Sequence, residues 1–215
     1  MKKSFIGALL LGATILPALQ GCFPMVAAGV TTGVLAAFDR RSVGTQTEDE
    51  SIEWKASSRV GEKLGDKAHL NFTSYNRKVL ITGEASSEEA KAEAESIVAA
   101  LPNVQEVYNE LAVGSASSFS NRSNDAFITS KVKSRSVDTG KFNPVHAKVV
   151  TEAGIVYMMG MLTQPEADAA INVARTTAGV RKVVNLVEII APVKARELDI
   201  TQSKNNGKPA EVKNP

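Results

Sequence analysis

An internal repeat is the feature that most constrains how this 215-residue chain can fold. Sliding the sequence over itself by 76 or 77 residues aligns residues 79–83 with 156–160, and residues 103–109 with 179–185. Both aligned pairs keep the same order of apolar and polar positions. Because similarity at one long offset indicates repeated structural units, the sequence predicts two copies of one small domain.

Each copy has the pattern of a helix, a strand hairpin, a second helix and a closing strand. The first helices are expected at residues 51–64 and 125–137, because apolar side chains recur there at helical spacing. In the first copy there follow a strand around 70–72, a turn at 75–77, a strand at 78–83, a helix at 87–101 and a strand at 107–113. This αββαβ order predicts an α+β protein, each copy being a three-stranded mixed sheet with two helices on one face.

The second helix of each copy carries a start signal. Residues 86–90 and 163–167 place a hydroxyl residue shortly before a Glu, at Glu88 and Glu89 in the first copy and at Glu166 in the second. In a capping box the hydroxyl accepts from the third helical amide and the Glu reaches back to the cap residue. We therefore expect a capping box in both copies, and no other role for these three carboxylates.

The repeat also sets the domain boundaries. The first copy is expected at residues 48–114 and the second at 124–192, with a Ser- and Asn-rich linker at 115–123 between them. The polar residues 193–215, rich in Lys and Asn, are expected to be disordered. Because so short a domain buries little surface by itself, we expect each copy to pack against its twin or against a partner.

The N-terminus has the pattern of a secretion signal. Lys2 and Lys3 precede an apolar run at residues 5–19 that is short for a membrane-spanning helix. The run ends in Leu-Gln-Gly before Cys22, the only cysteine, and this pattern is typical of bacterial lipoproteins. We expect residues 1–21 to be removed and Cys22 to carry diacylglycerol and an N-acyl chain. The alternative is a secreted protein with a spare thiol, which is a liability in an oxidising compartment.

The acyl chains would anchor the chain through residues 22–47, which we interpret as a lipidated N-terminus and linker. At about 0.8 kcal/mol per buried methylene, several chains hold a protein on a membrane without a spanning helix. Phe23 follows the cysteine where Asp would favour retention in the inner membrane. The prediction is therefore a periplasm-facing protein of the outer membrane.

The two copies differ in charge. Residues 48–114 hold 7 basic and 13 acidic side chains, a net charge of −6, whereas residues 125–192 hold 8 basic and 6 acidic, a net charge of +2. Because the two copies have electrostatic fields of opposite sign, we expect them to face different partners. No block is basic enough to indicate a nucleic-acid partner, and the chain has a single Trp for stacking on bases.

The repeated pattern resembles a known family. In each copy a hairpin ends in an apolar run and Gly, a capped Ala-rich helix follows, and a Val-x-x-Val-x-Asn strand closes the unit. This layout resembles the BON domain over residues 48–114 and 124–192. With Cys22 and the linker residues 41–46, it resembles dual BON-domain lipoproteins of the outer membrane. The resemblance implies a non-enzymatic protein that binds anionic phospholipid, phosphatidylglycerol in particular, through the first helix of the second copy. It also implies a role in outer-membrane integrity, cell division and stress response.

The side chains of that helix also indicate a lipid-binding surface. Ile128 and Val132 mark its buried side, which places the aromatic ring of Phe127 on an exposed flank. An aromatic ring beside a lysine is typical of membrane interfaces. The predicted lipid-binding side chains are Phe127, Ser130, Lys131, Lys133, Ser134 and Arg135. The alternative is that Phe127 packs against the other domain or against the neighbours of the first turn.

Two binding alternatives remain. An envelope scaffold would use the acidic first copy and Trp54 to hold a protein partner, although Trp54 could also pack between the domains or within its own. A peptidoglycan anchor would need a groove of convergent polar and aromatic groups, which an aromatic content of 5% disfavours.

No catalytic pattern stands out. His69 and His146 are 77 residues apart at equivalent places of the two copies, which favours a repeated structural role over a metal site or catalytic dyad. The sequence has no Gly-x-Ser-x-Gly elbow and no Gly-rich phosphate loop between a strand and a helix. We expect no enzyme, no metal and no cofactor other than the covalent acyl chains.

Overall fold

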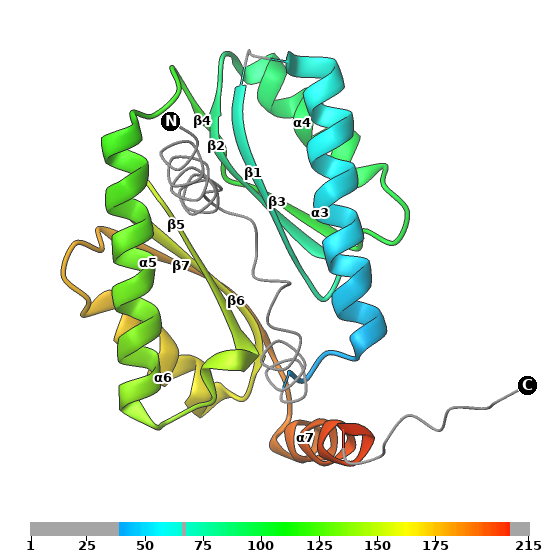
Figure 1. The fold of residues 1–215 in the computed structure, drawn as a ribbon, viewed down its shortest axis with the longest axis vertical. Coiled ribbons are helices and arrows are strands. Elements are labelled where there is room, and N and C mark those ends of the chain that lie inside the picture. The colour runs from blue at the N-terminus through cyan, green and yellow to red at the C-terminus, as the bar shows by residue number, and fades with distance from the viewer. Residues whose placement is uncertain (1–38, 66–67, 207–215) are drawn as a thin grey trace, which may run out of the picture. The chain divides into compact units, whose positions relative to one another are not determined.

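The computed structural model describes residues 39–65 and 68–206 (Figure 1). The predicted signal peptide, Cys22 and the apolar segment 25–38 lie outside the described residues, as do residues 207–215. Within the described part, the chain forms both predicted copies and one additional helix.

The first copy is built from two helices and four strands. In chain order they are α3 (Val43–Leu64), β1 (Ala68–Tyr75), β2 (Lys78–Ala85), α4 (Glu88–Ala99), β3 (Glu106–Asn109) and β4 (Ala112–Val113). The central strand β2 pairs antiparallel with β1 and parallel with β3 and β4. The predicted mixed sheet is confirmed.

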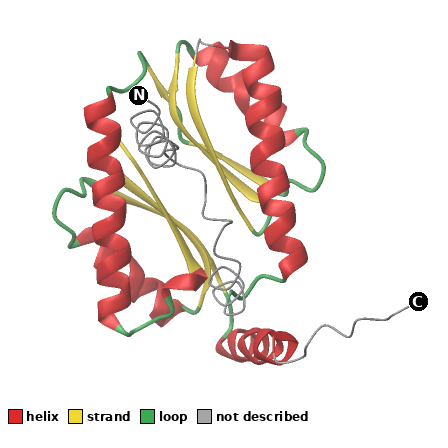
Figure 2. Cartoon of the chain, viewed as in Figure 1, coloured by secondary structure: helices red, strands yellow, loops and turns green. Residues whose placement is uncertain are grey.

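The second copy repeats this plan. It consists of α5 (Phe119–Thr139), the short 3-10 helix η3 (Pro144–His146), β5 (Ala147–Glu152), β6 (Ile155–Leu162), α6 (Gln164–Arg175) and β7 (Lys182–Ile189). The central strand β6 is antiparallel to β5 and parallel to β7. The helices and strands of both copies are distinguished by colour in Figure 2. The α+β class and the αββαβ order are confirmed.

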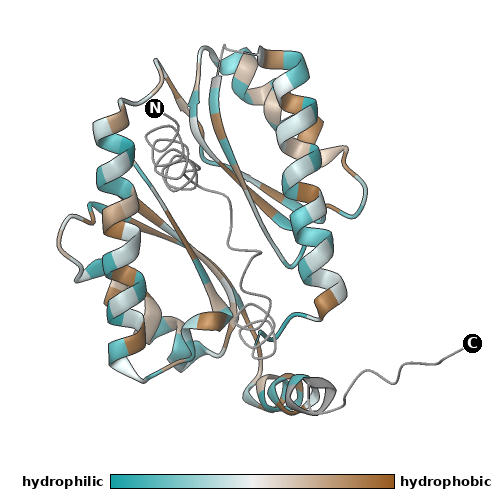
Figure 3. Cartoon of the chain, viewed as in Figure 1, coloured by the Kyte–Doolittle hydropathy of each residue, from teal (hydrophilic) through white to brown (hydrophobic). Residues whose placement is uncertain are grey.

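Each sheet carries its two helices on one face, and a separate core lies between. In the first copy Ile52 and Val60 of α3 meet Ala94 of α4 and Ile81 of β2. The second core is built from the equivalent elements and adds Phe142 and Met158, and its central strand β6 is apolar along much of its length (Figure 3). Successive side chains of a strand point to opposite faces, and both faces of β6 are covered: Val156 and Met158 lie in this core, and Tyr157 lies in the cluster on the other face.

The face of each sheet that carries no helix contributes to a third cluster, which the two copies share. Tyr75 and Leu80 of the first copy pack with Tyr157 and Met159 of the second, all at most 3% exposed. The expectation that each small domain packs against its twin is confirmed.

Polar contacts surround this shared cluster. Lys148 Nζ lies 2.6 Å from Glu53 Oε1, and Asn71 Nδ2 donates to Glu152 Oε2 over 3.2 Å. Burial and the nearby Glu84 carboxylate raise the pKa of Glu152.

Both first helices begin earlier than predicted. Ser42 is the N-cap of α3 and accepts a hydrogen bond from Thr45 N (3.1 Å), and Ser118 does the same for Asn121 N at the start of α5 (3.2 Å). Their first turns are mostly exposed and polar, so no apolar periodicity marks them. The last residues of the predicted linkers 22–47 and 115–123 are therefore helical.

The closing strand of the first copy is interrupted, which gives its sheet four strands where three were predicted. Between β3 and β4 the Asn109 side chain accepts from Leu111 N (3.3 Å), while Glu110 N donates to Ile81 O (3.0 Å). The equivalent strand β7 is continuous.

Only half of the first predicted capping box forms. Ser87 is the N-cap of α4 and accepts from Ala90 N, so the third helical position holds Ala and no Glu can reach back from it. The second box is confirmed, since Thr163 N donates to Glu166 Oε2 over 2.8 Å.

The disorder predicted for residues 193–215 is wrong for 193–206, which lie in helix α7 (Pro192–Asn206). Pro192 occupies the first helical position, where its missing amide costs nothing. Ala195 and Gln202 are buried, and Asp199 accepts from Arg40 (2.9 Å). The anchoring arginine is 159 residues away in sequence, so local composition did not reveal it.

Candidate functional site

Helix α5 presents an apolar ridge to solvent on the side opposite its buried face. Ile128 and Val132 are almost fully buried, whereas Phe119 is 79%, Phe127 63% and Val137 67% exposed. From residue 119 to residue 137 the helix rises roughly 27 Å at 1.5 Å per residue. We call these three side chains the α5 ridge. Helical spacing places Ser130 and Ser134 on the same side.

Phe127 forms a pair with a cation of the same helix. Lys131 Nζ lies 4.7 Å from the centroid of the Phe127 ring, which is cation–π geometry. The same ammonium donates a hydrogen bond to the carbonyl of Ala178, just beyond α6. The alternative in which Phe127 is packed away is wrong, because most of its surface is accessible.

Arg135 binds the C-terminal end of α6. Its Nη1 donates to Val173 O (3.1 Å) and Thr177 Oγ1 (2.7 Å), and its Nη2 to Thr176 Oγ1 (3.1 Å). A cation at a helix C-terminus also complements the helix dipole. Arg135 and Lys131 therefore join α5 to α6, a role that helical spacing alone did not reveal.

The remaining predicted lipid-binding residues are accessible. Ser130, Lys133 and Ser134 are exposed, and Ser130 Oγ donates back to Ala126 O (3.0 Å). Helical spacing places Lys133 on the flank of the ridge opposite Lys131. The structure thus brings Phe127 together with Ser130 and Ser134, and places cations on both flanks.

A buried aspartate in each first helix holds the hairpin turn of its copy. Asp125 accepts from Ala153 N (2.9 Å) and Gly154 N (2.8 Å), and Asp49 accepts from Asn76 N and Arg77 N (both 2.8 Å). Sequence reasoning missed both residues, although they align at the repeat offset of 76. They fix the hairpin against the helix that carries the candidate site.

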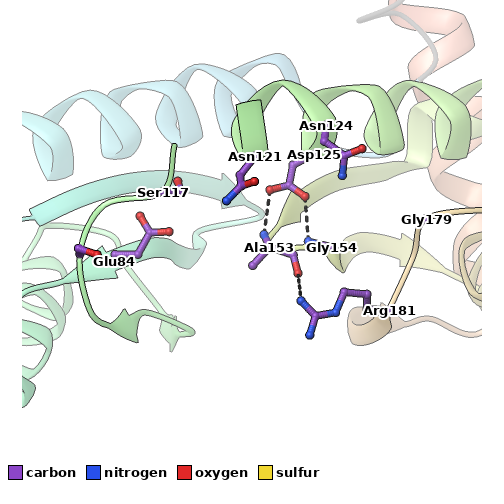
Figure 4. Close-up of a pocket in the computed structure, with 10 residues that line it drawn as sticks. Glu84, Ser117, Asn121, Asn124, Asp125, Ala153, Gly154, Gly179 and Arg181 are labelled. Atoms are coloured by element: carbon purple, nitrogen blue, oxygen red, sulfur yellow. Dashed lines mark hydrogen bonds between the residues drawn. The ribbon is translucent and has the colours of Figure 1, made fainter. Parts of the chain in front are cut away.

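A cavity of about 390 Å³ lies beside the first turns of α5 (Figure 4). It is lined by polar side chains from several elements: Ser115 and Ser117 of the linker, Asn121 and Asn124 of α5, Glu84 of β2, Arg181, and the turn at 153–154. Figure 4 shows the hydrogen bonds from the amides of that turn to Asp125, and these residues lie on one side of the cavity.

The two histidines lie in separate surroundings. His69 Nδ1 is 3.0 Å from Glu84 Oε2, whereas His146 Nε2 is 3.8 Å from Asp199 Oδ1. Within residues 39–65 and 68–206 no three His, Cys, Asp or Glu side chains are grouped as metal ligands.

The two histidines share a backbone role. A Cβ at Gly83 would lie 2.0 Å from His69 O, and a Cβ at Gly160 would lie 2.5 Å from His146 O. A glycine is therefore needed opposite each of these carbonyls, a backbone requirement in which the histidine side chains take no part.

Trp54 stands on α3 with 72% of its surface exposed. Packing within its own domain is therefore not its role. Among the residues that the structure describes, no cation pairs with the Trp54 ring as Lys131 does with Phe127.

The segment preceding α3 joins both copies and α7. Arg40 is 4% exposed and forms a two-bond contact with each of Glu166 and Asp199, at 2.8 to 3.2 Å, and a bond to Met161 O (2.8 Å). Arg41 pairs with Asp49 (2.8 Å) and lies 3.9 Å from the centroid of the Tyr75 ring.

The electrostatic effect of Arg40 is strongest on Glu166. Burial alone would raise the pKa of Glu166, but hydrogen bonds from Arg40 and Thr163 outweigh it and lower that pKa to about 2. Glu166 thus does more than cap α6, the only role that the sequence suggested.

Comparison with known proteins places this fold and repeat in a family. The family model of the BON domain matches residues 49–115 and again residues 124–191. The chain therefore belongs to the BON-domain family.

Curated relatives narrow the class. "Outer membrane lipoprotein DolP" of Haemophilus influenzae is 37% identical over 185 residues, which cover 85% of this chain and 95% of the relative. The "21 kDa hemolysin" of Actinobacillus pleuropneumoniae is 34% identical over 154 residues, covering 71% of this chain and 79% of that protein. The chain is a dual BON-domain outer-membrane lipoprotein, in a family of non-enzymatic lipoproteins.

Solved structures add little. The C-terminal domain of CdsD, a structural protein of the type III secretion system of Chlamydia trachomatis, is 13% identical, with coverage of 64% of this chain and 96% of that chain. The TM-score of 0.28 is too low to indicate a shared fold. Among the described residues, no helix has both the length and the apolar character required to traverse a bilayer.

Proposed function

We propose that this protein binds anionic phospholipid, phosphatidylglycerol in the first place, through α5 of the second copy. The binding is non-enzymatic and supports outer-membrane integrity, at the division site and under envelope stress. The observation that carries the proposal is the α5 ridge, three large apolar side chains exposed along one helix.

The chemistry of α5 fits a membrane interface. The Phe127 ring would enter the headgroup layer while the adjacent Lys131 ammonium meets phosphate. Lys133 lies on the other flank, and each such cation contributes about 1 kcal/mol at an anionic surface. Lys131 and Arg135 also hold α6, so their positions are fixed before lipid arrives.

Vesicle sedimentation tests the proposal. The probe is the chain from residue 22 with Cys22→Ser, which carries no acyl chain. It should co-sediment with phosphatidylglycerol vesicles and not with phosphatidylcholine vesicles. Since burying a Phe side chain is worth about 1.5–3 kcal/mol, Phe127→Glu should weaken binding by about 10- to 100-fold.

The matched control is Trp54→Glu, which removes an equally exposed aromatic ring from the first copy. It should leave vesicle binding unchanged. Equal binding to both lipids, or equal loss in both variants, would overturn the proposal.

The anchor belongs to the same proposal. Cys22 would carry the diacylglycerol and N-acyl chains, palmitate among them, after removal of residues 1–21, and hold the protein on the periplasmic side of the outer membrane. Mass spectrometry of the purified protein should show the acyl mass on Cys22, and Cys22→Ala should move the protein out of the membrane fraction. An N-terminus other than Cys22 would contradict it.

A second candidate function rests on Trp54. An exposed Trp on an acidic domain suits a protein partner, because Trp is enriched at the centres of interfaces. In this reading the first copy holds an envelope protein while the second holds lipid. Crosslinking in living cells from Ser57, an exposed position one turn along α3, should then capture one partner, and that product should be lost in Trp54→Glu but kept in Phe127→Glu.

A further inference from the structure

The cavity beside α5 is lined mainly by polar side chains. Hydroxyls from Ser115 and Ser117, amides from Asn121 and Asn124, the Arg181 guanidinium and the Glu84 carboxylate surround about 390 Å³, with no aromatic ring among them (Figure 4). Asp125 also lines the cavity, and both oxygens of its carboxylate accept from the hairpin amides.

Two lining groups have hydrogen-bonding capacity to spare. The guanidinium of Arg181 makes one long bond to Ala153 O (3.4 Å), which leaves most of its N–H donors. Ser117 Oγ is buried without a hydrogen-bond partner among the described residues. A buried hydroxyl without a partner is unfavourable, and a ligand oxygen would supply that partner.

The turn below positions Arg181. A Cβ at Gly154 would come within 2.8 Å of Arg181 Cδ, so only glycine lets the arginine stem lie across the turn. Asp125 holds the amide of that glycine (2.8 Å). Gly154 and Asp125 thus position the side chain of Arg181.

The first copy has a hydrogen bond at the equivalent place. At the repeat offset, Glu48 corresponds to Asn124 and Asn103 to Gly179. In the first copy the Asn103 side chain donates to Glu48 Oε1 over 3.0 Å and bridges the two elements. In the second copy Gly179 has no side chain to do so, and the cavity is lined by Asn124 and Gly179 instead.

The charge of the two places is also reversed. Gln105 of the first copy corresponds to Arg181, and Glu106 to Lys182. With the replacement of Glu48 by Asn124, two carboxylates are lost and two cations are gained. Relative to the first copy, these replacements favour an anionic ligand, and guanidinium with amides is the donor set that suits phosphate.

We propose that this cavity binds the phosphate ester of a phospholipid headgroup. Arg181 pairs with the phosphate, Asn121, Asn124 and Ser117 donate to its ester and hydroxyl oxygens, and Glu84 accepts from a hydroxyl at the far end. The assignment to lipid rests on the proposed function: Asn124 precedes Phe127 by about one helical turn, so a headgroup in the cavity would leave its acyl chains beside the ridge. A free phosphate ester shares the chemistry.

Titration with soluble headgroups separates these sources. The ligands are glycerophosphoglycerol, glycerophosphocholine and inorganic phosphate, added to the chain from residue 22 with Cys22→Ser and followed by amide NMR. Glycerophosphoglycerol should shift the amides of Asn121, Asn124, Gly154 and Gly179 saturably, and the other two ligands should bind at least fivefold more weakly. Inorganic phosphate binding as tightly would overturn the headgroup assignment.

Variants taken from the first copy test the cavity itself. Arg181→Gln and Asn124→Glu place the residues of the first copy at exposed positions, and each should weaken glycerophosphoglycerol binding by tenfold or more. Arg175→Gln removes an exposed guanidinium outside the cavity and should have no effect. Shifts elsewhere, or equal loss in all three variants, would overturn the proposal.

Failure of this inference is distinguishable from failure of the proposed function. Phe127→Glu should lose vesicle binding yet keep glycerophosphoglycerol binding, because Phe127 does not line the cavity. Vesicle binding without any cavity titration would remove the headgroup site and leave the α5 ridge. Cavity titration without vesicle binding would remove the membrane function and leave a site for a soluble phosphate ester.

Discussion

The two BON domains share one scaffold and differ in what that scaffold presents. Both hold their hairpin turn with a buried aspartate, both begin their first helix at a Ser, and both require a glycine opposite a histidine carbonyl. On the solvent side of the first helix, the first copy has one exposed Trp in an acidic field, whereas the second has the α5 ridge flanked by cations. Duplication therefore preserved the groups that fix the backbone and freed the outer face to diverge.

The largest effect should come from the shared aspartates, and it should differ between the copies. Asp49 accepts from two turn amides, Ser74 Oγ and Arg41, whereas Asp125 accepts from two amides. Removing a buried acceptor leaves its donors unpaired, so Asp49→Ala should lower the free energy of unfolding by about 4 kcal/mol and Asp125→Ala by about 2 kcal/mol. Urea titration measures both, and equal losses would show that the additional partners of Asp49 contribute nothing.

A somewhat smaller effect is expected at Arg40, which serves the second copy, while its neighbour Arg41 serves the first. Arg40→Ala leaves Glu166 and Asp199 without their cation and should cost about 3 kcal/mol at neutral pH. Hydrogen exchange should show the loss in α7 and α6, whereas for Arg41→Ala it should fall on the turn at 76–77. Loss of protection in the same elements for both variants would contradict this division.

The pH dependence follows from the lowered pKa of Glu166. A carboxyl whose folded pKa lies below its ordinary value of 4.5 stabilises the fold above that value, and the contribution is lost as pH falls toward about 2. The difference in unfolding free energy between the natural chain and Arg40→Ala should therefore shrink between pH 4.5 and pH 2. A difference that stays constant over that range would exclude the ion pair as its source.

A charge effect should sharpen the contrast between the two first helices. Lys133→Gln should weaken binding to phosphatidylglycerol vesicles by about fivefold at low salt, because one cation at an anionic surface is worth about 1 kcal/mol. The difference should vanish at high ionic strength. Ser57→Lys adds the same charge at the equivalent position of α3, and improved binding there would mean that the first copy also meets the membrane.

The smallest effect concerns the caps of the second helices. Thr163→Ala in α6 should cost about 1 kcal/mol or slightly more, and Ser87→Ala in α4 slightly less, since only Thr163 is part of a reciprocal box. Thermal unfolding of both variants measures the difference. A larger loss at Ser87 would show that the reciprocal bond is unimportant.

Sequence patterns predicted what depends on periodicity. The repeat, the αββαβ order and the buried stripe of Ile128 and Val132 follow from spacing alone, and so does the exposure of Phe127. The early starts of α3 and α5 were missed because their first turns are polar, and helix α7 was missed because its anchor, Arg40, is distant in sequence.

The cavity was missed for a related reason. Its lining includes Gly179 and Asn124, two residues that carry no signal until the repeat is compared position by position. That comparison, Glu48 with Asn124 and Asn103 with Gly179, was available from the sequence. The meaning of the difference came only from the hydrogen bond that joins Asn103 to Glu48.

The most direct test of the division of labour uses the single Trp of the chain as a depth probe. Vesicles of phosphatidylglycerol brominated on its acyl chains quench a Trp that enters the bilayer interface. The account predicts that Trp54 of the natural chain stays unquenched, whereas a chain carrying both Trp54→Phe and Phe127→Trp is quenched strongly. Quenching of the natural chain with none in the exchanged chain would contradict it and assign the membrane to the first copy.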